Sequence, residues 1–182
     1  QLAKRLITVD EYHTMAEAGI LTREDRVELI HGEILEMSPI GSKHAAIVNT
    51  MSNRLIRLLG DGVIISVQNP IRINDLTEPE PDLSLLKPKE NYYADGHPAP
   101  NDTFIVIEIS DSSYEYDKEV KLPLYASAGI PEYWIVNMDK KQIEVHTKPE
   151  NGGYKSWQFF AIDDFITFDF CSTEIQVKKL IV

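Results

Sequence analysis

The sequence predicts an α/β fold in which a mixed central sheet is flanked by helices and followed by a strand-rich C-terminal part. Residues 42–59 carry apolar side chains at helical spacing, which is typical of a helix that packs on a sheet. Residues 103–110 are almost continuously apolar, as expected of a strand whose two faces are both covered by helices. Beyond residue 139, strand-like segments alternate with turn signals, which favours antiparallel hairpins.

The N-terminal segment predicts two short helical elements and a strand. A helix is expected over residues 8–18, because Thr8 and Glu11 stand at the spacing of a capping box. Residues 23–30 are expected to form one or two further helical turns, and residues 33–37 to form a strand.

The clearest helix is predicted over residues 42–59, with Ser42 as its N-cap and Gly60 as its C-cap. Its sheet-facing stripe consists of Ile47, Met51, Leu55 and Leu58. His44 stands at the head of this stripe, so its side chain is expected to point inward.

The remaining elements complete a mixed sheet. Strands are expected at residues 63–73, 83–86, 103–110, 133–138, 142–147, 153–160 and 175–178. Residues 87–102 contain three prolines and read as a surface loop. A helix is expected over residues 117–128, and this order of elements fits a sheet flanked by helices.

Length and composition bound the function. The length of 182 residues favours a single domain over residues 1–182, and no apolar run approaches the roughly 18–20 residues of a membrane-spanning helix. The net charge of −11 argues against a protein that coats nucleic acid through a basic face, but a bound metal could supply positive charge to an enzyme locally. The single cysteine, Cys171, excludes an intrachain disulfide and fits a cytoplasmic location.

Glu108 is the most informative residue, because it is a lone carboxylate in an apolar strand. Strand alternation places Phe104, Val106, Glu108 and Ser110 on one face. Burying a carboxylate is costly unless a cation neutralises it. Glu108 is therefore either a metal ligand or a member of a structural ion pair.

Two further residues are candidates for the same site. Asp82 follows a stiff Pro-rich segment, and it is either a second metal ligand or an aspartate that bonds a loop amide at the start of a strand. Lys121 shares a helical stripe with Tyr125, so it borders the sheet-facing side, although a solvated lysine is the alternative. Pro123 predicts that the regular helix begins only near residues 120–122 or is kinked there.

Two carboxylates and a lysine are the residue types that phosphodiester hydrolysis requires. The carboxylates of Asp82 and Glu108 could hold Mg²⁺ or Mn²⁺, which lowers the pKa of a bound water. The amine of Lys121 could position that water or stabilise negative charge on the phosphate.

Four segments of the chain resemble the Uma2 family, also known as a domain of unknown function. They are RVELIHGEILEMSP (26–39), EPEPDLSLL (78–86), FIVIEIS (104–110) and YDKEVKLPLYASAGIPEYWIVN (116–137). The resemblance covers nearly the whole chain and implies a restriction-endonuclease-like fold of the PD-(D/E)xK group. It further implies divalent-metal chemistry on nucleic acid and a homodimer.

The resemblance also implies roles for individual residues. Asp82 and the proline before it match the PD element, and Glu108 matches the second acidic position. Ser110 stands where that group expects its lysine, so the resemblance implies that Lys121 on the following helix has taken over this role. Glu28 looks like the acidic residue contributed by the N-terminal helix.

Other titratable residues leave alternatives open. His44 could be a general base, an additional ligand or a core histidine. Asp117 is expected to be an N-cap, although it could touch the site. No catalytic role is expected for His31 or His97, which stand in polar loops.

The leading interpretation is a Mg²⁺-dependent endonuclease that acts on DNA as a homodimer. Four basic residues are expected to help hold the substrate backbone: Arg54, Arg57, Lys87 and Lys89. One alternative is a nuclease-like binding or regulatory module with a weakened site, which the acidic composition and Ser110 favour. Another is a hydrolase of small phosphoesters.

Overall fold

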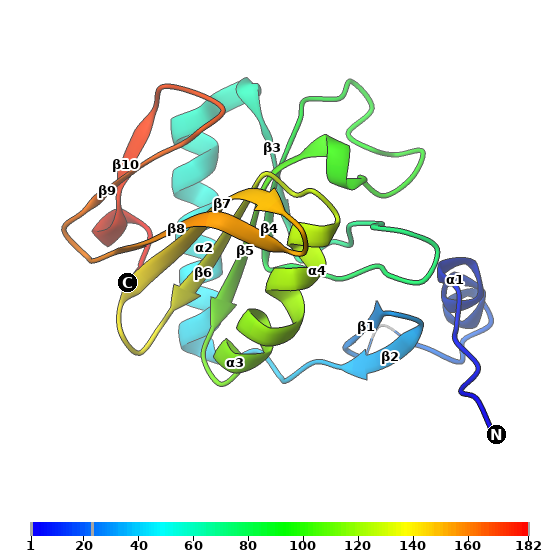
Figure 1. Cartoon of the computed structure of the whole chain (residues 1–182). Helices are drawn as coiled ribbons and strands as arrows, with labels where there is room; N and C mark the ends of the chain where they lie inside the picture. Colours follow the sequence, from blue (N-terminus) through cyan, green and yellow to red (C-terminus); the bar gives the residue numbers. More distant parts are fainter. Residues whose placement is uncertain (1, 23, 182) are drawn as a thin grey trace.

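The computed structural model describes residues 2–22 and 24–181, and a six-stranded mixed sheet forms its centre (Figure 1). In spatial order its strands are β3 (Ile64–Val67), β4 (Leu83–Leu86), β5 (Thr103–Ser110), β6 (Glu132–Asn137), β7 (Gln142–Glu150) and β8 (Gly153–Phe160). The β5–β6 pair is parallel, and the other neighbouring pairs are antiparallel. The predicted mixed sheet with a strand-rich C-terminal part is confirmed.

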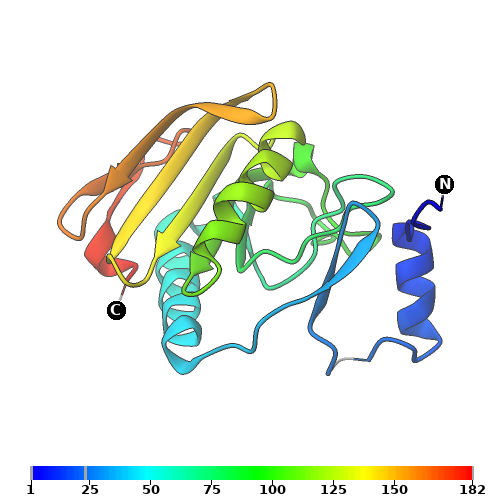
Figure 2. The same cartoon turned by 60° about the horizontal axis from the view of Figure 1, so that its bottom comes forward.

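Helices cover the two faces of this sheet (Figures 1 and 2). On one face lie α2 (Ser42–Leu59) and the C-terminal segment, which contains β9 (Phe165–Thr167) and β10 (Glu174–Gln176). On the other face lie α3 (Tyr114–Tyr116), a π-helical segment (Asp117–Lys121) and α4 (Leu122–Ser127). Short 3-10 turns occur at Gly60–Gly62, Pro100–Asp102 and Val177–Lys179.

Strand β5 divides its side chains between these two layers. Ile105, Ile107 and Ile109 join the core under α2, whereas Val106 joins the core under α4. Phe104 does not follow the predicted alternation, because the β4–β5 register shifts between Leu85 and Leu86. Phe104 therefore packs against the α2-side core and stacks on Phe170, with ring centroids 4.4 Å apart.

The N-terminal part forms a helix and a separate hairpin. Helix α1 (Val9–Glu17) has the predicted capping box, in which Thr8 Oγ1 accepts from the Glu11 amide at 3.2 Å. The helical turns predicted for residues 23–30 are wrong where the structure describes them, because β1 (Val27–Ile30) pairs antiparallel with β2 (Glu33–Glu36). Arg23 lies outside the described residues.

A two-residue turn explains why this hairpin forms instead of a helix. His31 and Gly32 both adopt positive φ, at 51° and 76°, as tight hairpin turns require. Strand β1 is also bridged to the segment before β4, since the Glu78 amide donates to the Leu29 carbonyl at 2.7 Å. These long-range bonds outweigh a local helical tendency.

Helix α2 has the predicted span and ends at Gly60, but two details of the prediction are wrong. Its N-cap is Gly41 and not Ser42, and no side chain caps it. Leu58 is 39% exposed, so it does not join the buried stripe. Strand β3 is shorter than predicted because Gln68, with φ of 48°, turns the chain after Val67.

The segment between β5 and β6 is less regular than one helix. A π-helical stretch precedes α4 in one continuous helical run, and Pro123, whose missing N–H removes one backbone bond, follows shortly after that stretch. The prediction that the regular helix begins near residues 120–122 is confirmed. Within the described part of the chain, no helix is both long and apolar enough to cross a membrane.

Candidate active site

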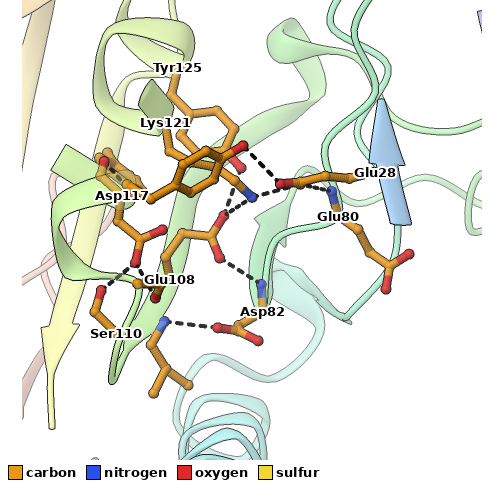
Figure 3. Close-up of polar contacts among 12 residues, drawn as sticks. Glu28, Glu80, Asp82, Glu108, Ser110, Asp117, Lys121 and Tyr125 are labelled. Atoms are coloured by element: carbon orange, nitrogen blue, oxygen red, sulfur yellow. Dashed lines mark hydrogen bonds and ion pairs between the residues drawn. The ribbon is translucent and has the colours of Figure 1, made fainter. Parts of the chain in front are cut away.

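A cleft of about 500 Å³ opens where the β1–β2 hairpin, the start of α2, the segment before β4 and the end of β5 meet. The residues that line it and carry acidic or basic side chains are Arg26, Glu28, Glu36, His44, Glu80, Asp82, Glu108, Asp111, Asp117 and Lys121. Figure 3 shows the central members of this set converging from separate elements. The structure thus brings together all four residues singled out in the sequence, Glu28, Asp82, Glu108 and Lys121.

Lys121 is the central cation of the cleft and is only 4% exposed. Its Nζ donates to Glu28 Oε2 at 2.8 Å and to Glu108 Oε1 at 3.0 Å. Burial alone would lower the pKa of Lys121, but the charges of Glu108 and Glu28 and their hydrogen bonds outweigh it and raise the pKa. The ammonium therefore remains charged between its two carboxylates.

Glu108 is buried at 6% exposure and points into the layer between β5 and α4. Its Oε1 also accepts from the Tyr125 hydroxyl at 2.9 Å, while its Oε2 receives only a long contact of 3.3 Å from the Asp82 amide. Burial raises the pKa of Glu108 to about 8, although the Lys121 ammonium opposes this shift. The charges of neighbouring carboxylates add to this shift, because the carboxylates of the cleft outnumber its cationic side chains.

Asp82 is fixed by contacts on several sides. Its Oδ2 accepts from the Ile109 amide at 2.9 Å and lies 2.9 Å from His44 Nε2. Its Oδ1 receives only a long contact of 3.4 Å from the Gln68 amide group. His44 therefore lies at the cleft as a partner of Asp82 and is not a core histidine. The hydrogen bond to Asp82 raises the pKa of His44.

Glu28 reaches the cleft from strand β1 and not from a helix, which corrects the prediction for its element. Its Oε2 also accepts from the Glu80 amide at 3.3 Å, and its Oε1 accepts from the Tyr116 hydroxyl at 3.3 Å. Glu80 itself is half-buried, and burial raises the pKa of its carboxyl group. Sequence reasoning missed Glu80, although its position two residues before Asp82 in an extended segment was a usable signal.

Asp117 is a cleft residue and not the predicted N-cap. It lies inside a continuous helical stretch, and its Oδ2 accepts from Ser110 Oγ at 2.6 Å and from Ser113 Oγ at 2.8 Å. Burial raises the pKa of Asp117. Ser110, at the position where a lysine was expected, therefore bonds Asp117. The amine that contacts Glu108 comes from Lys121 instead.

The expected phosphate-contacting residues do not lie at the cleft. Arg54 and Arg57 stand ten or more residues along α2 from His44, which at about 1.5 Å per residue is roughly 15 Å or more. Lys87 follows the C-terminal end of β4, whereas Asp82 precedes the N-terminal end of that strand. Arg26 is the arginine that lines the cleft, and its guanidinium donates to the Ser38 carbonyl at 2.7 Å.

The residues present fit a divalent metal ion that prefers oxygen ligands. Asp82 and Glu108 each keep one carboxylate oxygen, Oδ1 and Oε2, with no contact shorter than 3.3 Å among the described residues. Both oxygens belong to a cleft rich in carboxylates, which suits Mg²⁺ or Mn²⁺.

Comparisons with known proteins identify a family and a similar fold. The sequence pattern of the Uma2 family, described as "Putative restriction endonuclease", matches residues 9–177. The fold is similar to a crystal structure described as a putative nuclease belonging to DUF820 from Anabaena variabilis ATCC 29413, with a TM-score of 0.71 and 18% sequence identity. That match covers 96% of this chain and 97% of the other. No match was found among curated proteins.

Proposed function

Since the chain belongs to the Uma2 family of putative restriction endonucleases, we propose that it is a metal-dependent endonuclease that hydrolyses phosphodiester bonds of DNA. One observation carries the proposal. The Lys121 ammonium lies 3.0 Å from Glu108, in the cleft that also contains Asp82. This is the set of groups that the PD-(D/E)xK pattern requires, with the lysine supplied by a helical segment in place of the strand.

Asp82 and Glu108 would hold Mg²⁺ or Mn²⁺ through the oxygens that have only long contacts. When bound, such an ion supplies an activated water and neutralises charge on the phosphate. Lys121 is held in a charged form beside that position and stabilises negative charge that develops on the phosphate oxygens. Glu28 positions Lys121, and His44 positions Asp82.

A binding or regulatory module without activity is the second candidate. The observation that favours it is the double engagement of Lys121, whose Nζ bonds both Glu28 and Glu108. A substrate phosphate must compete with these carboxylates for the same ammonium.

A cleavage assay separates the two candidates. Purified protein is mixed with plasmid and single-stranded DNA in Mg²⁺ or Mn²⁺, with and without chelator, beside Glu108→Ala and Lys121→Ala. Chelator-sensitive cutting that both variants lose supports the nuclease. If the folded protein neither cuts DNA nor binds these metals, the result supports the binding or regulatory module instead.

We further propose that the enzyme is a homodimer, as the family resemblance implies. Exposed aromatic side chains on the edge strand β8 support this idea, because Trp157 is 60% exposed and stacks edge-on with Phe159. Sedimentation of the wild type and of Trp157→Ser tests the proposal. A monomeric wild type at the concentrations used in the assay would exclude it.

A further inference from the structure

A second group of metal-ligating side chains lies outside the candidate active site, where α1 meets the segment before β4 and the loop after it. It consists of His13 on α1, Glu78 and His97. Each residue offers one ligand atom, and these three atoms lie within 4.8 Å of one another. We infer that the three residues bind a divalent transition-metal ion of the Zn²⁺ type, separate from any ion in the cleft.

Glu78 is the anchor of this group. It is 2% exposed, and its backbone is fixed by the bond from its amide to the Leu29 carbonyl at 2.7 Å. Its Oε1 lies 2.6 Å from His13 Nε2, but its buried Oε2 has no hydrogen-bond partner among the described residues. A buried carboxylate oxygen without a partner is destabilising, and a cation at this position supplies what is missing.

The two histidines are placed so that they can complete the site. The rings of His13 and His97 lie 5.8 Å apart at an angle of 75°, and both approach the same carboxylate. Zn²⁺ bonds of about 2.0–2.1 Å place tetrahedral ligand atoms roughly 3.3 Å apart. His13 must therefore move away from its 2.6 Å contact with Glu78, which its 40% exposed side chain permits.

The ligand set predicts which ion binds. Two imidazole nitrogens and one carboxylate suit Zn²⁺ and its transition-metal neighbours, and water completes the shell. Mg²⁺ prefers oxygen ligands alone, so it favours the carboxylate-rich cleft. The identity of the ion therefore distinguishes the two sites.

The position of the group indicates a structural ion. Glu78 begins the stiff segment Glu78-Pro79-Glu80-Pro81 that leads to Asp82, while His13 and His97 belong to α1 and to the loop over residues 87–102. An ion held by all three ties the N-terminal helix and this loop to the chain that carries Asp82. Binding at about a hundred times Kd should raise the melting temperature by about 5–10 °C.

The test measures Zn²⁺ binding by calorimetry, and the melting temperature, on the chelator-treated protein. The variants are His13→Ala, His97→Ala and Asp82→Asn, with His31→Asn as a matched control because His31 is exposed and lies at positive φ, which asparagine tolerates. His97 is exposed, so its substitution should leave the fold intact, and circular dichroism checks this.

We expect each substitution of His13 or His97 to weaken Zn²⁺ binding at least about 100-fold and to abolish the thermal shift. Asp82→Asn and His31→Asn should retain both. The inference is overturned if the wild type binds no Zn²⁺, or if the His13 and His97 variants bind it as the wild type does. Neither readout depends on DNA cleavage, so failure here leaves the proposed nuclease function untouched.

Discussion

Lys121 Nζ lies 3.0 Å from Glu108 Oε1, although the lysine comes from a π-helical segment and the glutamate from the central strand β5. Glu28, from a third element, holds the same ammonium at 2.8 Å. Because all three side chains are buried, the loss of one charge from this triad leaves its partners uncompensated.

Removing the cation of the triad should destabilise the fold as well as abolish activity. Lys121→Met leaves Glu28 and Glu108 buried without their ammonium, so we expect the free energy of unfolding to fall by about 3–5 kcal/mol. Urea denaturation measures this change. Lys155→Ala is the control, because the exposed pair of Lys155 with Glu150 should contribute at most about 1 kcal/mol. An equal fall in the free energy of unfolding in both variants would contradict the conclusion that Lys121 stabilises the fold through its buried ion pairs.

Moving the lysine back to the strand tests whether Lys121 replaces the lysine expected at position 110. Ser110 Oγ lies 2.6 Å from Asp117, so a lysine at position 110 gains a carboxylate partner at the cleft. We expect Ser110→Lys combined with Lys121→Met to cleave DNA measurably faster than Lys121→Met alone. A double variant that folds, by circular dichroism, but remains as inactive as the single one would argue against the replacement.

Arg26 should contribute to substrate binding more than to the chemical step. It is the arginine that lines the cleft, and cationic side chains at such a position contact phosphates. We expect Arg26→Ala to raise KM for DNA about tenfold with little change in kcat. Arg57→Ala on the far part of α2 is the matched control and should leave KM unchanged. A tenfold rise in KM for Arg57→Ala would instead show that this face of α2 contacts the substrate.

Glu132 predicts a pH dependence of stability outside the cleft. Burial raises the pKa of Glu132 to about 7, although a hydrogen bond from Trp134 Nε1 opposes the shift. Because the pKa in the folded state exceeds the unfolded value of 4.5, this group stabilises the fold below pH 4.5, and the contribution is lost as pH rises through 7.

Replacing this carboxyl group should remove the effect. The stability of Glu132→Gln relative to wild type should rise by about 3 kcal/mol between pH 4.5 and pH 8, as urea denaturation at both values can measure. A difference between the two proteins that stays constant with pH would show that the buried carboxyl does not titrate in this range.

Local patterns predicted much of the fold and the centre of the site. The continuous apolar run of β5 identified both the buried strand and the anomaly of Glu108, and Pro123 marked where the regular helix begins. The strand at β2 was predicted, but β1 was mistaken for helical turns, because its position depends on a bridge between Leu29 and Glu78, which are far apart in the sequence. Such a bridge has no signal within a short window of sequence.

The same limit applies to individual cleft residues. Arg26 has ordinary local surroundings, and only the tertiary structure brings it to the cleft. The polar loop around His97 gave no reason to expect a role for this residue. Its proximity to His13 and Glu78 depends on the tertiary structure, which brings three distant segments together.

The parallel pairing of β5 with β6 has a consequence for how the site is assembled. Parallel neighbours require a crossover connection, and here that connection is the helical stretch that carries Lys121. The lysine therefore reaches Glu108 from the connection that covers one face of the sheet between β5 and β6. A chain that ends before residue 132 already contains Asp82, Glu108 and Lys121, but it lacks β6, the strand that pairs in parallel with β5 behind them.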